Sequence, residues 1–176
     1  MQFDHFIIRP LQEDDVDAYF NLIQKNKKRL ENFFAGTISK TETLEDTKQF
    51  VSSMVKQATE KSYFAYLIVD TRLNTLIGFL DLKNIDWNIP KSELGCFIDA
   101  DYASQGITKK ASLLFCDHCF ETYKFKKLFL RTHASNTAVI QLAKHCGFQQ
   151  EGILRSDYKT SSGELVDLMY FGRLDR

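Results

Sequence analysis

Seven short apolar runs along the chain have the character of β-strands. They are rich in Val, Ile, Leu and Phe, and polar or turn-forming residues separate them, which is typical of the strands of a folded domain. The seven runs cover residues 5–11, 62–70, 75–82, 92–100, 127–134, 148–154 and 165–174. The chain therefore carries enough strands for one sizeable sheet.

Four further segments have the spacing of apolar residues that predicts amphipathic helices. The first follows the acidic residues 13–15, whose negative charge suits a helix N-terminus. The second covers residues 43–56 and opens with the spacing of a capping box. The other two cover residues 105–123 and 137–145.

The order of these elements predicts a mixed α/β fold. Along the chain it is β-α-α-β-β-β-α-β-α-β-β, which favours a largely antiparallel mixed sheet of about seven strands flanked by helices. The helix at 105–123 stands between two strands, so it is a crossover that makes those strands parallel neighbours. No repeat, low-complexity tract or linker divides the 176 residues, and single domains typically have about 100–200 residues. We therefore expect a single domain over residues 1–176.

Composition and charge narrow the classes of function. Apolar residues make up 44% of the chain and include 15 phenylalanines, which is ample for one core. The 23 basic and 23 acidic residues cancel, so no net field attracts nucleic acid or an anionic membrane. No apolar run approaches the roughly 20 residues of a membrane-spanning helix, and the N-terminal stretch turns acidic where a signal peptide is basic. We expect a cytoplasmic protein that binds neither nucleic acid nor membranes.

The four cysteines raise the question of metal or redox chemistry. Cys116 and Cys119 have CxxC spacing, and a second ligand pair for zinc would have to come from His145 and Cys146. However, Cys116 lies in an apolar helical run, where small buried thiols are common. Without a secretory signal, free thiols are also favoured over disulfides. We therefore expect buried thiols and no metal site.

A polar loop, YASQGITKKA at residues 102–111, precedes the long helix. N–H groups in the first turn of a helix have no partner inside the helix, and the helix dipole favours an anion there. Gly106 permits close approach of the backbone to a ligand, and Ser104 and Thr108 add hydroxyl groups. This chemistry suits a pyrophosphate, although a plain strand-to-helix connection can have the same composition. Neither the P-loop nor the GxGxxG dinucleotide pattern is present.

Three stretches give the chain a resemblance to a known superfamily. They are ELGCFIDADYASQGITKKA (93–111), THASNTAVIQLAKHCGFQQEGILR (132–155) and GELVDLMYFGRL (163–174). With the order of elements, they resemble the GNAT superfamily of N-acetyltransferases, and within it the enzymes that acetylate an N-terminal alanine or serine of ribosomal proteins. The resemblance covers nearly the whole chain. It implies the acyl-CoA N-acyltransferase fold, acetyl-CoA as donor and a primary amine as acceptor.

The same resemblance assigns the phosphate loop. The family pattern R/Q-x-x-G-x-G/A falls on residues 103–108, with Gly106 as the central glycine. Ala103, Ser104 and Thr108 depart from the pattern, but most contacts in such loops come from backbone N–H groups, which survive substitution. The resemblance therefore implies that the cofactor phosphates bind at Ser104, Gln105, Gly106, Ile107, Thr108 and Lys109.

Two further cofactor elements follow from the resemblance. The strand that contains Phe97 and Ile98 is expected to splay from its neighbour, so that its backbone pairs with the pantetheine arm as if the arm were an added strand. Asn136 matches an asparagine that bonds to the same arm. The alternative for Asn136 is an ordinary N-terminal cap of the helix that follows.

Two carboxylates are candidates for the general base that takes a proton from the acceptor amine. In the resembling enzymes an acidic residue just before a tyrosine has this role, and Asp157 before Tyr158 matches it if a gap of one residue is allowed. Glu93 is the second candidate, because period-two alternation places it on one strand face with Gly95 and Phe97. Each carboxylate can instead be solvated or salt-bridged.

An acid for the leaving thiolate is less clearly marked. The family often has a serine three residues after the asparagine, and this chain has Val139 there. The role is therefore vacant, filled by Tyr158 or water, or not needed.

Two classes of function stay open at this point. The first is an N-acetyltransferase whose amine acceptor is a protein N-terminus, a polyamine or an aminoglycoside. The second is a non-catalytic CoA-binding or interaction module, because the phosphate loop and Val139 depart from the family. Phe33 and Phe34 are expected either in the core or, as in the family, at the acceptor cleft. A homodimer is left open.

Overall fold

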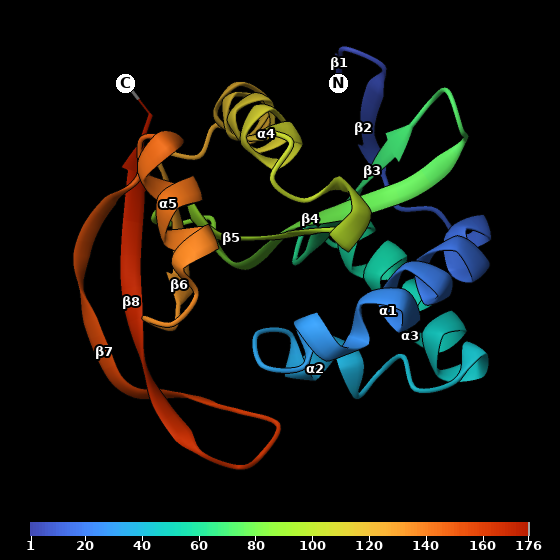
Figure 1. The fold of residues 1–176 in the computed structure, drawn as a ribbon. Coiled ribbons are helices and arrows are strands. Elements are labelled where there is room, and N and C mark those ends of the chain that lie inside the picture. The colour runs from blue at the N-terminus through green and yellow to red at the C-terminus, as the bar shows by residue number, and fades with distance from the viewer. Residues whose placement is uncertain (176) are drawn as a thin grey trace.

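The computed structural model describes residues 1–175 and contains one eight-stranded sheet with helices against both faces (Figure 1). The strands are β1 (Gln2–Phe3), β2 (Phe6–Pro10), β3 (Phe64–Asp70), β4 (Thr75–Asp86), β5 (Lys91–Ile98), β6 (Lys127–Thr132), β7 (Gln149–Lys159) and β8 (Leu165–Leu174). The helices are α1 (Val16–Leu30), α2 (Ala35–Ile38), α3 (Leu44–Thr59), α4 (Ile107–Tyr123) and α5 (Thr137–His145), with single 3-10 turns η1 (Glu13–Asp15) and η2 (Ala100–Tyr102). Within residues 1–175, no helix combines the length and the apolar character needed to cross a membrane.

The predicted order of elements is confirmed. The strand order across the sheet is β1-β2-β3-β4-β5-β6-β8-β7, and every neighbouring pair is antiparallel except β5 and β6. Helix α4 is the crossover that joins these two parallel strands, as expected. Two short elements escaped prediction, because β1 and α2 contain too few residues to show a periodicity. The start of α4 was predicted two residues too early, since Ser104 and Gly106 have φ of 60° and 76° and interrupt the helix.

Strand β3 is buried on both faces, which explains its uninterrupted apolar sequence. Phe64, Tyr66 and Ile68 belong to a core that packs against α4. Ala65 and Leu67, on the opposite face, belong to a second core with α1 and α3. The sheet is therefore the middle layer between two groups of helices.

The parallel pair in the centre of the sheet is joined over a short distance only. Residues Lys91 to Glu93 of β5 pair with Lys127 to Phe129 of β6. Beyond this point, no residue of the described chain pairs with the edge of β5 that faces β6. The predicted splay is confirmed, and it leaves an open strand edge inside the molecule.

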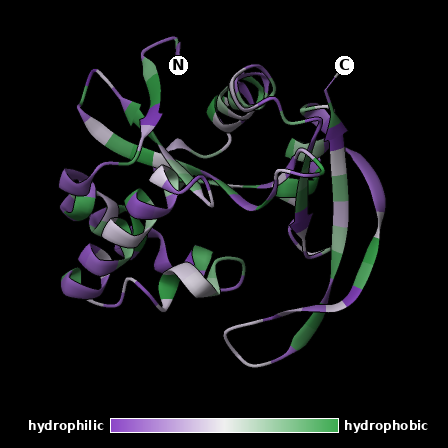
Figure 2. Ribbon diagram, turned by 180° about the vertical axis from the view of Figure 1, so that it is seen from behind, coloured by the Kyte–Doolittle hydropathy of each residue, from purple (hydrophilic) through white to green (hydrophobic). Residues whose placement is uncertain are grey.

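The β7–β8 hairpin extends away from the rest of the sheet (Figures 1 and 2). It carries apolar residues on an exposed surface, including Ile153 and Leu165. Between the pairs Leu154↔Leu168 and Tyr158↔Val166, β7 advances four positions while β8 advances two. This bulge centres on Ser156, whose φ is 52° and whose N–H donates to Asp167 Oδ1.

Candidate active site

Three cavities meet at the side chain of Phe33, which follows α1. The first, the α4 cavity, has a volume of about 610 Å³ and lies between the end of α1, the end of β5 and the starts of α4 and α5. The second, the carboxylate chamber, has about 140 Å³ and contains Glu93, Arg131 and Asp157. The third, the aromatic chamber, has about 320 Å³ and is bounded by α2, α3 and β4.

Most of the residues expected to bind the cofactor line the α4 cavity. They are Phe97, Ile98, Ser104, Gly106, Thr108, Lys109 and Asn136. Gln105 and Ile107 do not line it. The Gln105 side chain donates to the Asp101 carbonyl at 2.8 Å, and Ile107 is buried in the core. These two residues can therefore contribute only their backbone groups.

The loop that opens α4 has the features of an anion site. Among the hydrogen bonds of residues 1–175, none is donated by a backbone N–H of residues 104–109. Lys28, Arg29 and Lys109 surround this end of the cavity with positive charge. A Cβ added to Gly106 would meet nothing within 4 Å, so the glycine is required by its positive φ rather than by lack of space.

The contribution of α1 to this site was missed from the sequence. The sequence shows the basic run at 25–29, but it does not show which acidic residues this run pairs with. Lys25 Nζ lies 2.9 Å from Asp99 and 2.7 Å from Asp101, which ties the end of α1 to the segment before the loop. This link places Lys28 and Arg29 beside the α4 cavity.

The open edge of β5 forms the inner wall of the α4 cavity. The Phe97 ring packs against the rings of Phe34 and Phe79, with distances between ring centres of 5.3 Å and 5.5 Å. The Ile98 carbonyl accepts a hydrogen bond from Arg29 at 3.3 Å, so this one carbonyl already has a partner. The other edge groups from Leu94 onward suit an extended ligand that carries amides.

Asn136 combines the two roles that the sequence left as alternatives. Its Oδ1 accepts from the Val139 N–H at 3.4 Å, which makes it the N-cap of α5. The same side chain lines the α4 cavity, and so does Val139. The cap therefore leaves the Asn136 amide nitrogen available to a ligand.

Glu93 and Asp157, the two candidate bases, are held by one guanidinium. Arg131 Nη2 lies 2.8 Å from Glu93 Oε2, and Arg131 Nη1 lies 2.5 Å from Asp157 Oδ2. Asn84 also donates to Glu93 at 2.6 Å. Burial works to lower the pKa of Arg131, but the two carboxylates outweigh burial and raise that pKa. The sequence predicted both carboxylates and missed the arginine between them.

Phe33 and Phe34, which the sequence left between the core and the acceptor cleft, line the aromatic chamber, whereas the rest of its lining was not predicted. Phe34, Phe50 and Tyr63 line it, and the buried carboxyl of Asp81 lies among them. Burial raises the pKa of Asp81. Tyr158 separates this chamber from the carboxylate chamber, since it lines both.

Three of the four cysteines pack in the core, as expected, whereas Cys96 is half-buried and lines the α4 cavity. Cys116, Cys119 and Cys146 are buried and unpaired, and burial raises the pKa of Cys116 to about 12. The described part of the chain holds no cluster of three or more His, Cys, Asp or Glu side chains arranged for a metal ion.

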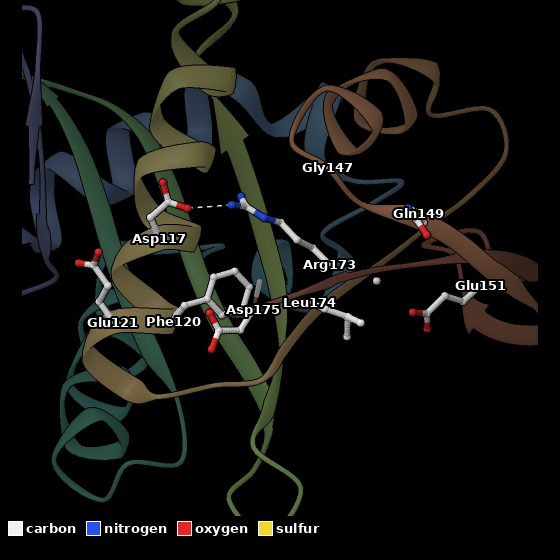
Figure 3. Close-up of a pocket in the computed structure, with 10 residues that line it drawn as sticks. Asp117, Phe120, Glu121, Gly147, Gln149, Glu151, Arg173, Leu174 and Asp175 are labelled. Atoms are coloured by element: carbon white, nitrogen blue, oxygen red, sulfur yellow. Dashed lines mark hydrogen bonds and ion pairs between the residues drawn. The ribbon is translucent and has the colours of Figure 1, made fainter.

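A fourth cavity, of about 480 Å³, lies between the C-terminal half of α4 and the end of β8 (Figure 3). Its lining includes an ion pair between Arg173 and Asp117, with a separation of 2.7 Å. It shares no lining residue with the three cavities at Phe33. It therefore lies outside the site described above.

Comparison with known proteins gives one consistent result. Residues 5–149 match the acetyltransferase (GNAT) domain family. YdaF of Bacillus subtilis strain 168, a proposed ribosomal N-acetyltransferase, is 27% identical over 176 residues, which is 98% of this chain and 93% of the relative. A spermidine N(1)-acetyltransferase of Vibrio cholerae is 20% identical over 151 residues, which is 86% of this chain and 83% of the relative. Among solved structures, RimL, a ribosomal L7/L12 alpha-N-protein acetyltransferase in complex with coenzyme A, has a TM-score of 0.89 at 20% identity, with 98% of this chain and 95% of that chain covered.

The chain belongs to the acetyltransferase (GNAT) family. It is an N-acetyltransferase that uses acetyl-CoA and an amine acceptor. The α4 cavity fits the donor, because it combines an open strand edge, free N–H groups at a helix start and three basic side chains.

Proposed function

We propose that the chain acetylates the N-terminal amine of a protein, and that residues 1–176 act as one N-acetyltransferase domain. The observation that supports this is the meeting of the α4 cavity and the two chambers at Phe33, beside the open edge of β5. Donor and acceptor can meet there from opposite directions. Two of the similar proteins carry names that refer to ribosomal substrates, which favours a protein amine over a polyamine.

The roles of the donor-binding residues follow from their positions. Backbone N–H groups of residues 104–109, with Lys28, Arg29 and Lys109, would bind the phosphates. The β5 edge and the Asn136 amide would hold the arm between phosphates and thioester. When bound, acetyl-CoA supplies an acetyl group activated as a thioester. The aromatic side chains around Phe97 exclude water from this group.

The transfer needs one group that takes a proton from the acceptor amine and a second group that gives a proton to the leaving thiolate. Asp157 and Glu93 stay predictions for the proton acceptor, and their shared bonds to Arg131 oppose that role because they already compensate both charges. Tyr158 is our candidate for the proton donor. Its oxygen accepts from the Ala35 N–H, so its own proton is left to donate.

The test is an acetyl transfer assay with a panel of amines. Peptides with free N-termini, the same peptides with blocked N-termini, and spermidine are incubated with acetyl-CoA. Free thiol and product mass are both measured. Acetylation confined to free peptide N-termini supports the proposal. Acetylation of spermidine alone contradicts the protein acceptor, and binding of acetyl-CoA without turnover on any amine supports the non-catalytic alternative. A cytoplasmic location and a homodimer stay predictions.

A further inference from the structure

Two charged side chains of β4 occupy the space above Gly95 of β5. A Cβ added to Gly95 would overlap Asp81 Oδ1 and would lie 3.3 Å from Lys83 Nζ. Gly95 stands between Glu93, which lines the carboxylate chamber, and Phe97, which lines the α4 cavity. The carboxyl of Asp81 therefore lies at the junction of the donor and acceptor cavities.

This junction is also where the reactive end of the donor arrives, an argument that rests on the proposed function. The phosphates bind at residues 104–109, beyond the end of β5. The arm then runs back along the open edge from Ile98 toward Leu94. The unpaired part of the edge ends at Glu93, because β5 is paired with β6 from Glu93 back to Lys91. The thioester at the end of the arm thus lies beside Gly95.

Among the described residues, Asp81 is the one carboxyl with a buried side-chain oxygen that has no hydrogen-bond partner. Its Oδ2 accepts from the Tyr63 hydroxyl at 2.8 Å, whereas its Oδ1 has no hydrogen-bond partner among residues 1–175. Only 4% of the Asp81 surface is exposed. Because buried polar atoms are normally paired, this oxygen has the capacity to accept a bond from a further donor. An acceptor ammonium that enters the aromatic chamber is such a donor.

We propose that Asp81 is the catalytic residue that takes the proton from the acceptor ammonium. An N–H bond of the ammonium breaks, its proton binds Asp81 Oδ1, and the nitrogen keeps the electron pair. The neutral nitrogen then forms a bond to the thioester carbon, and the carbon–sulfur bond breaks. The second proton lost by the nitrogen passes to the thiolate, with Tyr158 as relay. Asp81 afterwards returns its proton to solvent.

The charged and titratable groups around Asp81 support this role. Burial raises the pKa of Asp81, while the Lys83 charge, the Tyr63 hydrogen bond and the backbone N–H of Gly95 oppose that rise. Glu93 of β5 adds to the rise, and the Tyr19 hydroxyl faces the same carboxyl from α1. A proton acceptor works best when its pKa lies near the operating pH, so a carboxyl with a raised pKa suits this role better than a carboxyl with an ordinary pKa. Since Asp81 must be ionised to work, activity is lost as the pH falls through its raised pKa.

The deciding experiment compares Asp81→Asn with Glu93→Gln and Asp157→Asn in the full chain. For each variant, kcat, KM and coenzyme A affinity are measured across a pH series with the peptide acceptor. We expect Asp81→Asn to lower kcat about a hundredfold at neutral pH, within the usual range for a proton acceptor. The loss shrinks as the pH rises, because more acceptor is then neutral, and coenzyme A affinity is unchanged. If Asp81→Asn keeps the wild-type profile, or if Asp157→Asn alone shows this pH-dependent loss, the proposal is overturned.

A second variant keeps the test valid if Asp81→Asn folds poorly. Tyr63→Phe removes a hydrogen bond that lowers the pKa of Asp81, so the acidic limb of the kcat profile should move to higher pH. If the role of Asp81 is purely structural, Tyr63→Phe lowers stability and leaves the acidic limb of the kcat profile in place. That result contradicts the proposal. Wild-type protein that acetylates no amine refutes the proposed function and the role of Asp81 together. Active wild-type protein with unaffected Asp81 and Tyr63 variants overturns only the role of Asp81.

Discussion

The hydroxyl oxygen of Tyr158 accepts a hydrogen bond from the Ala35 N–H at 3.1 Å, although the two residues are 123 positions apart. This bond joins the β7–β8 hairpin to α2 at a residue that lines both the carboxylate chamber and the aromatic chamber. The hairpin is otherwise an extension of the sheet with many exposed residues. The contact therefore holds the hairpin beside the two chambers.

Tyr158→Phe should lower both turnover and stability. Loss of the hydroxyl removes the bond to Ala35, which is worth about 1 kcal/mol of unfolding free energy. If Tyr158 also protonates the thiolate, kcat falls about a hundredfold, the low end of the range for acid–base groups. Thermal unfolding and the thiol-release assay measure the two effects. Tyr123→Phe, far along α4, is the matched control, and a stability loss with unchanged kcat would limit Tyr158 to holding the hairpin.

Gly106→Val should weaken coenzyme A binding at least tenfold. The added side chain would project into the α4 cavity, and the left-handed backbone at φ 76° would cost about 1–2 kcal/mol of stability. Titration calorimetry measures the affinity. Gly152→Val is the control, because a Cβ there also meets nothing within 4 Å and its φ is not in the left-handed region. Unchanged affinity in Gly106→Val would refute the phosphate loop.

Two substitutions at Asn136 separate its cap from its ligand bond. Asn136→Ala removes both, so coenzyme A affinity should fall by about 1–2 kcal/mol and stability by about 1 kcal/mol. Asn136→Asp keeps an oxygen for the Val139 N–H, so stability should stay near that of the wild type. It loses the amide donor and adds a negative charge, so affinity should still fall. Normal affinity in Asn136→Asp would leave the residue as a helix cap only.

Arg131→Met should destabilise the fold, because it leaves Glu93 buried without its cationic partner. We expect a loss of about 3 kcal/mol, the low end of the range for breaking a buried pair. Chemical denaturation measures the loss. The double variant with Glu93→Gln should recover part of it, since the remaining amide is neutral and still bonds to Asn84. No recovery would mean that Arg131 acts mainly through Asp157 and the hairpin.

The order of elements was readable from the sequence because each long helix and strand carries its own pattern of apolar residues. Strand β3 has no alternation, because it is buried on both faces, but its uninterrupted apolar run marks it as a strand. The short elements β1 and α2 have no such signal. The start of α4 was also misplaced, because the left-handed conformation of Ser104 comes from the folded loop and leaves no mark on residue type.

The candidate site was only partly readable, for a related reason. Gly106 and Asn136 belong to local motifs, so their places in the α4 cavity were found. Asp81 and Arg131 are single charged residues inside apolar strands. Their meaning depends on partners across the sheet, namely Gly95 for Asp81 and Glu93 for Arg131. One sequence does not give those pairings.

The short pairing of β5 with β6 also bears on selectivity. Exposed strand edges invite other strands to pair with them, and proteins usually block or cover such edges. Here the unpaired edge lies between two strands that diverge after Glu93 and Phe129. A chain of amides and methylenes can pair with this edge and needs no room for side chains on the two faces of the sheet. The divergence of the two strands thus lets the backbone of β5 take part in selecting the donor, in addition to the side chains around it.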